Sequence, residues 1–391
     1  MPKLLAALDA AGGQTRFVGG CIRDTLLGID VNDIDLATRL QPQEVMDRLK
    51  RAKIRSVPTG LAHGTVTAIL DGAPVEVTTL RRDVSTDGRR ATIAYTEDWT
   101  EDASRRDFTV NALTADPETG EIFDYFSGLT DLEARRVRFI GDPLTRIAED
   151  HLRILRFFRF HARFGAGEPE AAGLEACTRR ANDLMALSRE RIADELLKLL
   201  SLPDPLPTVT LMVKRGIFAP VLPEFGSQGL ARLAELIRRE RTAGEPPEPL
   251  RRLAALLPAD PQPASTVGAR LRLSNKAVKR LAAAADRQDA EDDPRILAYR
   301  IGIEGAVDRL LLGYDPPEAV AAKVGELRAW TMPRFPLSGS DVIGMGLAAG
   351  PIVAKTLQAI EREWIAQGFS GDRETLRTLA RAHVDQALRD G

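Results

Sequence analysis

The pattern of apolar and polar positions divides the chain into two parts near residue 140. Between residues 15 and 140, short runs rich in β-branched residues alternate with helical segments, which predicts a mixed α/β domain. After Pro143, apolar residues recur at helical spacing almost to the end, so we expect the remainder to be all helical. The runs expected to form strands are TRFVGG, DIDLAT, KIRSV, GTVTAIL, PVEVTTL, EIFDYF and RVRFIG, with helices near residues 20–27 and 42–51.

Proline-rich stretches interrupt the helical part, namely LPDPLP, EPPEP, PADPQPA and DPP. Because they are too short to be disordered linkers, we interpret them as helix stops between packed subdomains. The expected fold class is α+β, with a mixed-sheet head followed by a helical neck, body and tail. The expected boundaries are 1–140 for the head, 141–203 for the neck, 204–310 for the body and 311–391 for the tail.

Composition narrows the classes of function. The 54 basic and 56 acidic residues give a net charge of -2, so any nucleic-acid site must be local. The sequence contains no apolar run of about 18 residues that could span a bilayer. Its two cysteines, Cys21 and Cys177, are in neither a metal-binding nor a redox spacing. A reducing compartment is therefore expected, and with it a cytoplasmic location.

The segment GGCIRDTLLG follows the first expected strand and predicts a glycine turn leading into a short helix. Glycine adds no Cβ, so backbone N–H groups at Gly20 can approach an anion closely. Arg23, in the first turn of the helix, is placed to add a charged fork to the same phosphate. A tight turn with a purely structural role is equally compatible with this segment.

Asp33 and Asp35 follow within the expected strand DIDLAT. Side chains two positions apart in a strand point to one face, so both carboxylates can hold the same divalent ion or adjoining ions. Ile34 and Leu36 occupy the opposite face, which leaves the acidic face open. Mg²⁺ prefers carboxylates together with substrate phosphates, which predicts a bound nucleoside triphosphate.

The motifs GGCIRD, DID, RRDFTVNAL and EDHLRILRFFRF, in this order over residues 14–200, closely resemble those of class II tRNA nucleotidyltransferases and related bacterial poly(A) polymerases. The heads of these enzymes belong to the polymerase-β-like nucleotidyltransferase superfamily. The resemblance implies addition of CCA to the 3′ end of tRNA from CTP and ATP, without a template, with Mg²⁺ as cofactor and pyrophosphate released. It implies tRNA, ATP and CTP as partners, with no membrane partner; protein partners stay unknown.

The resemblance also assigns roles to residues. It makes Asp33 and Asp35 the catalytic, magnesium-binding residues and lets Asp107 hold the ribose, with Asn111 as structural support. Asp150 and Arg153 would read the base, because adenine and cytosine both present an amino donor beside a ring-nitrogen acceptor, whereas guanine and uracil do not. The expected nucleotide-binding residues are Gly20, Arg23, Arg106, Asp107, Asp150, Arg153, Arg156 and Arg159.

In AEDHLRILRFFRF, four residues are expected three positions apart on one helix: Asp150, Arg153, Arg156 and Arg159. Arg156 and Arg159 would there contact phosphates or lock Asp150 in place; for Arg159 and Arg163, an ordinary salt-bridged helix is equally compatible. In the next helix, Ser188 is expected as N-cap and Arg191 as a brace for the nucleotide site, unless the helix is simply amphipathic.

Glu76 has two interpretations, because it is either a third carboxylate of the site or an exposed strand residue. The polar segment 81–98 is expected to be a mobile loop, which in similar enzymes favours addition of all three nucleotides. The helical tail is expected to contact tRNA or to serve only in helix packing. The rival functions are a poly(A) polymerase or A-adding enzyme, which shares the head, and a catalytically silent RNA-binding protein.

Overall fold

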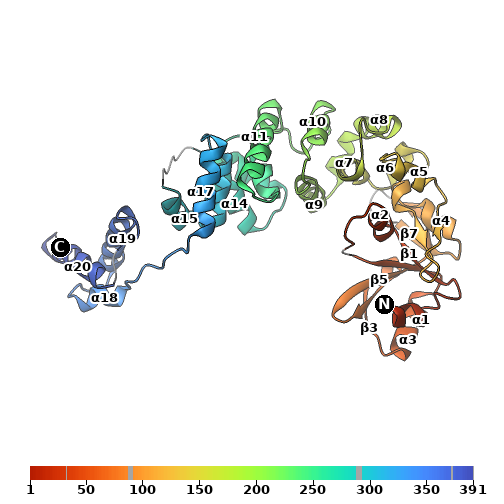
Figure 1. Ribbon diagram of the computed structural model, residues 1–391, viewed down its shortest axis with the longest axis horizontal. Helices are drawn as coiled ribbons and strands as arrows, with labels where there is room; N and C mark the ends of the chain where they lie inside the picture. Colours follow the sequence, from red (N-terminus) through yellow and green to blue (C-terminus); the bar gives the residue numbers. More distant parts are fainter. Residues whose placement is uncertain (32, 87–90, 288–292, 371–372, 391) are drawn as a thin grey trace.

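The computed structural model describes residues 1–31, 33–86, 91–287, 293–370 and 373–390. Figure 1 shows a curved, elongated molecule with the sheet-containing head at one end and the C-terminal helices at the other. The expected α+β class is confirmed, because β-strands occur in the first 123 residues and the described residues beyond them contain only helices as regular elements.

The head is built on a seven-stranded mixed sheet of order β3-β4-β5-β2-β1-β8-β9. Only β2 and β5 pair in parallel; the other pairs are antiparallel. The strands are β1 (Thr15–Val18), β2 (Asp35–Thr38), β3 (Arg55–Gly60), β4 (Thr65–Leu70), β5 (Ala73–Thr79), β8 (Thr114–Ala115) and β9 (Ile122–Phe123).

Two of the head helices cover one face of this sheet. The head helices are α1 (Pro2–Ala7), α2 (Gly20–Leu26), α3 (Pro42–Arg51), α4 (Trp99–Ser104) and α5 (Gly128–Glu133), with 3-10 turns η1 (Leu61–His63) and η2 (Thr109–Asn111). Leu4 of α1 and Leu49 of α3 pack with Leu36 and Val77 of the sheet in one buried cluster. Since side chains alternate along a strand, Asp35 and Glu76 lie on the other face.

One strand prediction and one loop prediction in the head were wrong. The segment RVRFIG is not a strand, because Phe139 forms only an isolated bridge to Phe108 and its ring stacks on Phe157 of the neck. The polar segment 81–98 is not a loop throughout, since β6 (Arg81–Thr86) and β7 (Ala91–Tyr95) pair as an antiparallel hairpin. Residues 87–90 at its tip lie outside the described residues.

The helices after the head fall into two packing groups. One buried cluster runs from Phe108 to Leu327, and a second holds residues from Leu337 to Val384. No helix in the described ranges is both long and apolar enough to cross a lipid bilayer.

The helices up to residue 243 are α6 (Pro143–Glu149), α7 (Arg153–Phe164), α8 (Ala171–Arg179), the 3-10 turn η3 (Ala181–Ala186), α9 (Arg189–Leu200), α10 (Leu206–Lys214) and α11 (Ser227–Ala243). The later helices are α12 (Pro249–Leu256), α13 (Pro261–Arg270), α14 (Asn275–Ala285), α15 (Pro294–Ile301), α16 (Ile303–Leu312), α17 (Pro317–Ala329), α18 (Gly339–Gly344), α19 (Pro351–Ala366) and α20 (Arg373–Asp390).

Candidate active site

A polar cavity of about 570 Å³ lies between the sheet and helix α7. All ten residues that the sequence predicted for the site line it: Gly20, Arg23, Asp33, Asp35, Arg106, Asp107, Asp150, Arg153, Arg156 and Arg159. Five further residues complete the lining: Gly19, Arg105, Asn111, Phe160 and Arg163. Seven arginines thus face four aspartates, an excess of positive charge that suits a polyphosphate.

The glycine turn between β1 and α2 forms one wall of the cavity. Gly19 has φ 75° and ψ -124°, a backbone conformation that side-chain-bearing residues rarely adopt. A Cβ at Gly19 would lie 3.4 Å from Nη1 of Arg106. Sequence reasoning selected Gly20, which begins the helix, whereas the conformation that requires glycine is at Gly19.

The two predicted metal-binding carboxylates are not both in a strand. Strand β2 begins at Asp35, and Asp33 lies in the irregular segment before it, although both line the cavity. Asp35 is paired with Glu76 across β2 and β5. Burial raises the pKa of Asp35, and the nearby charges of Glu76 and Asp33 raise it further, against the opposing effect of Arg106. A cation at this position would relieve the repulsion.

Within the described ranges, no group of three or more His, Cys, Asp or Glu side chains is arranged to hold a metal ion by itself. The carboxylates of Asp33 and Asp35, which both line the cavity, fit an ion that takes its remaining oxygen ligands from phosphates and water, as Mg²⁺ commonly does.

Arg23 is held deep in the wall. Its guanidinium donates from Nε to Asp24 at 2.9 Å and from Nη1 to Oδ1 of Asn111, and it lies over the ring of Phe164. Burial lowers the pKa of Arg23, and Asp24 opposes that effect. Asp24 also accepts from Arg163 of α7 at 3.2 Å, so its carboxylate joins the head to the neck.

Asp102 of α4 organises two of the cavity's arginines. Its buried carboxylate accepts from Arg105 at 2.8 Å and from Arg106 at 3.1 Å, and it also accepts from the backbone N–H of Arg81. Within the described part of the chain, Nε of Arg106 is buried without a hydrogen-bond partner. No role for Asp102 was expected from the sequence; its spacing of four residues from Arg106 is the signal that could have indicated one.

Asp107 is buried beside the neck. It accepts from Nη2 of Arg156 at 2.6 Å, from the Asn111 amide at 3.0 Å and from the backbone N–H of Phe108. Burial acts to raise the pKa of Asp107, but Arg156 and Asn111 outweigh it, so the pKa is lowered and the carboxylate stays ionised. Asn111 thus supports both Arg23 and Asp107, in the structural role expected of it.

The predicted single helix of AEDHLRILRFFRF is broken. α6 ends at Glu149, Asp150 adopts an extended conformation, and α7 begins at Arg153. Asp150 is held by Arg191 of α9 at 2.7 Å, so the lock is neither Arg156 nor Arg159. Arg191 thus braces the cavity as predicted, whereas Ser188, at the N-cap position of α9, makes no capping side-chain bond.

The remaining arginines are already engaged by carboxylates of the protein. Arg153 pairs with Glu149 at 2.5 Å and donates to the carbonyl of Arg105. Arg159 pairs with Glu195 of α9 at 2.6 Å, and the same carboxylate lies 3.7 Å from Arg156. Glu195 was missed from the sequence; its spacing of four residues from Arg191 places both on one face of α9.

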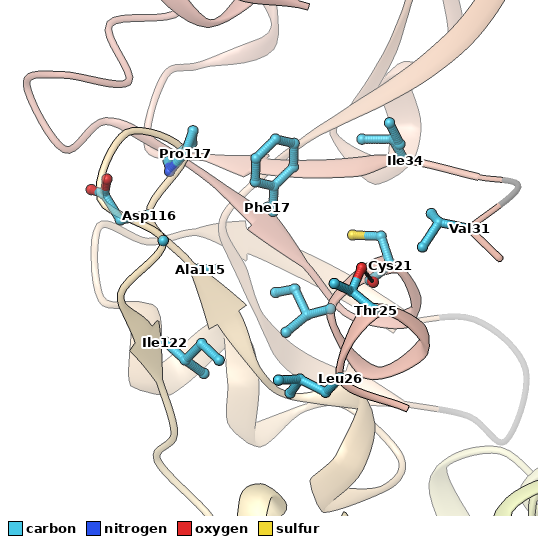
Figure 2. Close-up of a pocket in the computed structure, with 12 residues that line it drawn as sticks. Phe17, Cys21, Thr25, Leu26, Val31, Ile34, Ala115, Asp116, Pro117 and Ile122 are labelled. Atoms are coloured by element: carbon cyan, nitrogen blue, oxygen red, sulfur yellow. Dashed lines mark hydrogen bonds between the residues drawn. The ribbon is translucent and has the colours of Figure 1, made fainter. Parts of the chain in front are cut away.

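A second cavity, of about 400 Å³, lies on the other side of α2 (Figure 2). Its walls are mainly apolar, with Phe17, Cys21 and Ile34 among them. The Thr25 hydroxyl donates to the carbonyl of Cys21, and the Cys21 thiol contacts the carbonyl of Val18, so these polar groups are already paired. This cavity lacks the positive charge that a triphosphate needs, and the polar cavity is the better candidate.

Two family models match the chain. The "Poly A polymerase head domain" matches residues 15–138, and the "Probable RNA and SrmB- binding site of polymerase A" matches residues 168–228. The first match agrees with the polymerase-β-like head expected from the motifs.

Similar proteins cover almost the whole chain. The mouse mitochondrial CCA tRNA nucleotidyltransferase 1 is 33% identical over 379 residues, which are 93% of this chain and 85% of the mouse protein. The CCA-adding enzyme of Limosilactobacillus fermentum is 32% identical over 390 residues, with 96% and 95% coverage. The solved structure of the Bacillus stearothermophilus CCA-adding enzyme in complex with CTP superposes with a TM-score of 0.75 and 26% identity, over 100% of this chain and 99% of that one. The chain therefore belongs to the family of CCA-adding tRNA nucleotidyltransferases.

Proposed function

We propose that this protein adds CCA to the 3′ end of tRNA without a nucleic-acid template, using CTP and ATP and releasing pyrophosphate. The observation that carries the proposal is that one cavity holds paired carboxylates, an excess of arginines and the Asp150–Arg153 pair. The names of the relatives, which are CCA-adding enzymes, support the same reaction.

Asp33 and Asp35 are the proposed catalytic residues and would hold Mg²⁺. When bound there, the ion would activate the attacking 3′-hydroxyl and neutralise charge on the leaving pyrophosphate. The crowding of Asp35 with Glu76 and Asp33 supports this role, because a cation removes the repulsion that, after burial, raises the pKa of Asp35.

Arginines and the glycine turn would hold the nucleotide. Gly20, Arg23, Arg106, Arg156 and Arg159 are proposed to contact the triphosphate, with Arg106 also near the sugar. Asp107 would accept from the 2′-hydroxyl, the group that distinguishes ribonucleotides from deoxyribonucleotides. The unpartnered Nε of Arg106, in the described residues, supports a polar ligand at this wall.

Asp150 and Arg153 would select the base. A carboxylate can accept from the amino group of cytosine or adenine, and a guanidinium can donate to the neighbouring ring nitrogen. Uracil and guanine present a carbonyl and an N–H instead, so neither side chain could form its hydrogen bond with them. The support of Asp150 by Arg191 favours a preset orientation for this selection.

The division into a head (1–140), neck (141–203), body (204–310) and tail (311–391) remains our proposal, with the neck reading the base and the tail contacting tRNA. A cytoplasmic location is proposed as well, because Cys21 and Cys177 are free thiols, as expected in a reducing compartment.

The test is incorporation by the purified protein of CTP and ATP into tRNA that lacks its terminal CCA, with Mg²⁺ present. Products that stop at the restored CCA support the proposal. Open-ended A tails would indicate a poly(A) polymerase, addition of A alone would indicate an A-adding enzyme, and no incorporation would indicate an RNA-binding protein. The Asp33→Ala and Asp35→Ala variants serve as controls for the metal site.

A further inference from the structure

Helix α9 links the candidate site to the helical body. Near its N-terminus Arg191 holds Asp150 at 2.7 Å, and near its middle Glu195 holds Arg159 at 2.6 Å. At its C-terminal end, the carbonyl of Leu200 accepts from Arg252 of α12 at 2.8 Å. Figure 1 shows α9 between α7 and the helices of the body, and α9 packs against both α7 and α12. Because a continuous helix moves as a rod, a shift at one end displaces the other.

Arg252 is the residue that fixes the C-terminal end of α9. It is 2% exposed, and besides Leu200 it donates to the carbonyl of Leu202. Its Nε and Nη2 lie 2.9 and 2.8 Å from the carboxylate of Glu240 on α11. A cation beside the last carbonyls of a helix interacts favourably with the partial negative charge there. One guanidinium therefore joins the end of α9 to a fixed carboxylate.

That carboxylate belongs to a buried chain of alternating charges. Glu240 accepts from Arg251 at 2.9 Å, and Arg251 donates to Asp308 of α16 at 2.8 Å. Asp308 in turn accepts from Arg280 of α14 at 2.6 Å. Each buried charge depends on its neighbour's position, because an unpaired charge in the interior is costly. Arg252 is thus tied directly to Glu240, whereas Arg280 lies at the far end of the network, four pairings away.

We infer that Arg252 is a positioning residue for base selection: it holds α9 at the axial position from which Arg191 orients Asp150 and Glu195 orients Arg159. The inference rests on the proposed function, since it takes Asp150 as a reader of the base. Arg252 itself does not line the cavity. A substitution of Arg252 would therefore affect the bound nucleotide only by changing the position of helix α9.

The experiment compares Arg252→Gln with Arg280→Gln in the full-length chain. Both remove one cation of the same network, but only Arg252 contacts the end of α9. Steady-state kinetics with tRNA lacking CCA give kcat and KM for CTP and for UTP, at a temperature where circular dichroism shows each variant to be folded. We expect Arg252→Gln to lower the CTP-over-UTP ratio of kcat/KM by roughly tenfold, the scale of one lost base contact. Arg280→Gln should leave the ratio within about twofold of wild type.

The Arg252→Lys variant provides a second test of the inference. A single ammonium keeps the charge but cannot span both Glu240 and the α9 carbonyls as the guanidinium does, so an intermediate ratio is expected. If Arg252→Gln does not fold, Arg252→Lys decides by the same criterion. An unchanged ratio in the Arg252 variant, or an equal loss in Arg280→Gln, overturns the inference. Wild-type protein that incorporates neither CTP nor ATP would instead overturn the proposed function.

Discussion

Asp35 on β2 and Glu76 on β5 are directly paired across two parallel strands, with both side chains on the face of the sheet opposite to the packed core. Burial of Asp35, followed by the charges of Glu76 and Asp33, raises the pKa of Asp35. A carboxyl whose pKa is higher in the folded state favours folding when protonated. That stability is lost as the pH rises through the folded-state value.

We therefore predict that Asp35→Asn abolishes nucleotide incorporation while making the metal-free protein more stable at pH 7. The gain should disappear below about pH 4, where Asp is protonated in the unfolded chain as well. Thermal melts in EDTA between pH 3 and 8, with incorporation assays alongside, measure both effects. The Glu76→Gln variant should also make the metal-free protein more stable at pH 7. A melting temperature of Asp35→Asn below that of wild type at pH 7 would contradict the prediction.

The pKa of Asp107 is shifted in the opposite direction to that of Asp35. Burial acts to raise its pKa, but Arg156 and Asn111 overcome this and lower it, so its contribution to stability is present above the unfolded-state pKa and is lost as the pH falls through the folded-state value. Asp107→Asn should cost about 1.5–3 kcal/mol at pH 7, the scale of a hydrogen bond to a charged group. Urea unfolding at pH 7 and at pH 3 measures the cost, which should shrink at the lower pH.

The same variant tests the proposed sugar contact. The ratio of kcat/KM for CTP over dCTP should fall in Asp107→Asn, because the neutral amide oxygen is a weaker acceptor for the 2′-hydroxyl than the carboxylate it replaces. Asp131→Asn is the matched control: Asp131 is buried and paired with Arg136 and Arg138, away from the cavity. Equal loss of sugar discrimination in both variants would refute the role of Asp107.

Arg191→Gln should weaken base selection. Without the 2.7 Å contact from Arg191, Asp150 is no longer oriented, and misincorporation of UTP relative to CTP should rise roughly tenfold, within the 1–3 kcal/mol of a base contact. Lys198→Gln is the control, since Lys198 lies on the same helix in an exposed pair with Asp194. Single-turnover incorporation with each nucleotide measures the ratio; a comparable rise for Lys198→Gln would remove the case for Arg191.

The ten residues selected from the sequence could be expected to lie together because their signals are local. The glycine turn, the Asp33–Asp35 spacing and the spaced arginines each lie within a short segment, and all line the cavity. The break at Asp150 could not be predicted, because no proline or glycine marks it. The extended backbone there is instead accompanied by a contact with Arg191, 41 residues away.

The boundaries of the strands could not be predicted, because they depend on pairing between segments that are distant in the sequence. RVRFIG has the alternation of a strand, yet Val137 and Phe139 are buried in the cluster shared with the neck instead of joining the sheet. Asp33 falls outside β2 because the ladder with β5 begins at Asp35. Glu195 and Asp24 bind arginines of α7 from distant segments, so their roles appear only in the folded chain.

The glycine pair offers a test within two adjacent positions. Gly19 has φ 75°, where an added Cβ is strained and would lie 3.4 Å from Arg106, whereas a Cβ at Gly20 would make an ordinary 3.5 Å contact with Arg23. Gly19→Ala should lower stability by about 1–3 kcal/mol, because a residue with a Cβ is strained at this φ. It should also raise KM for CTP, because relief of that strain shifts the turn that lines the cavity. Gly20→Ala should keep wild-type stability, since alanine suits a helix. Urea unfolding and CTP kinetics of the pair decide the matter: if Gly19→Ala matches Gly20→Ala in both, the backbone at residue 19 does not need glycine.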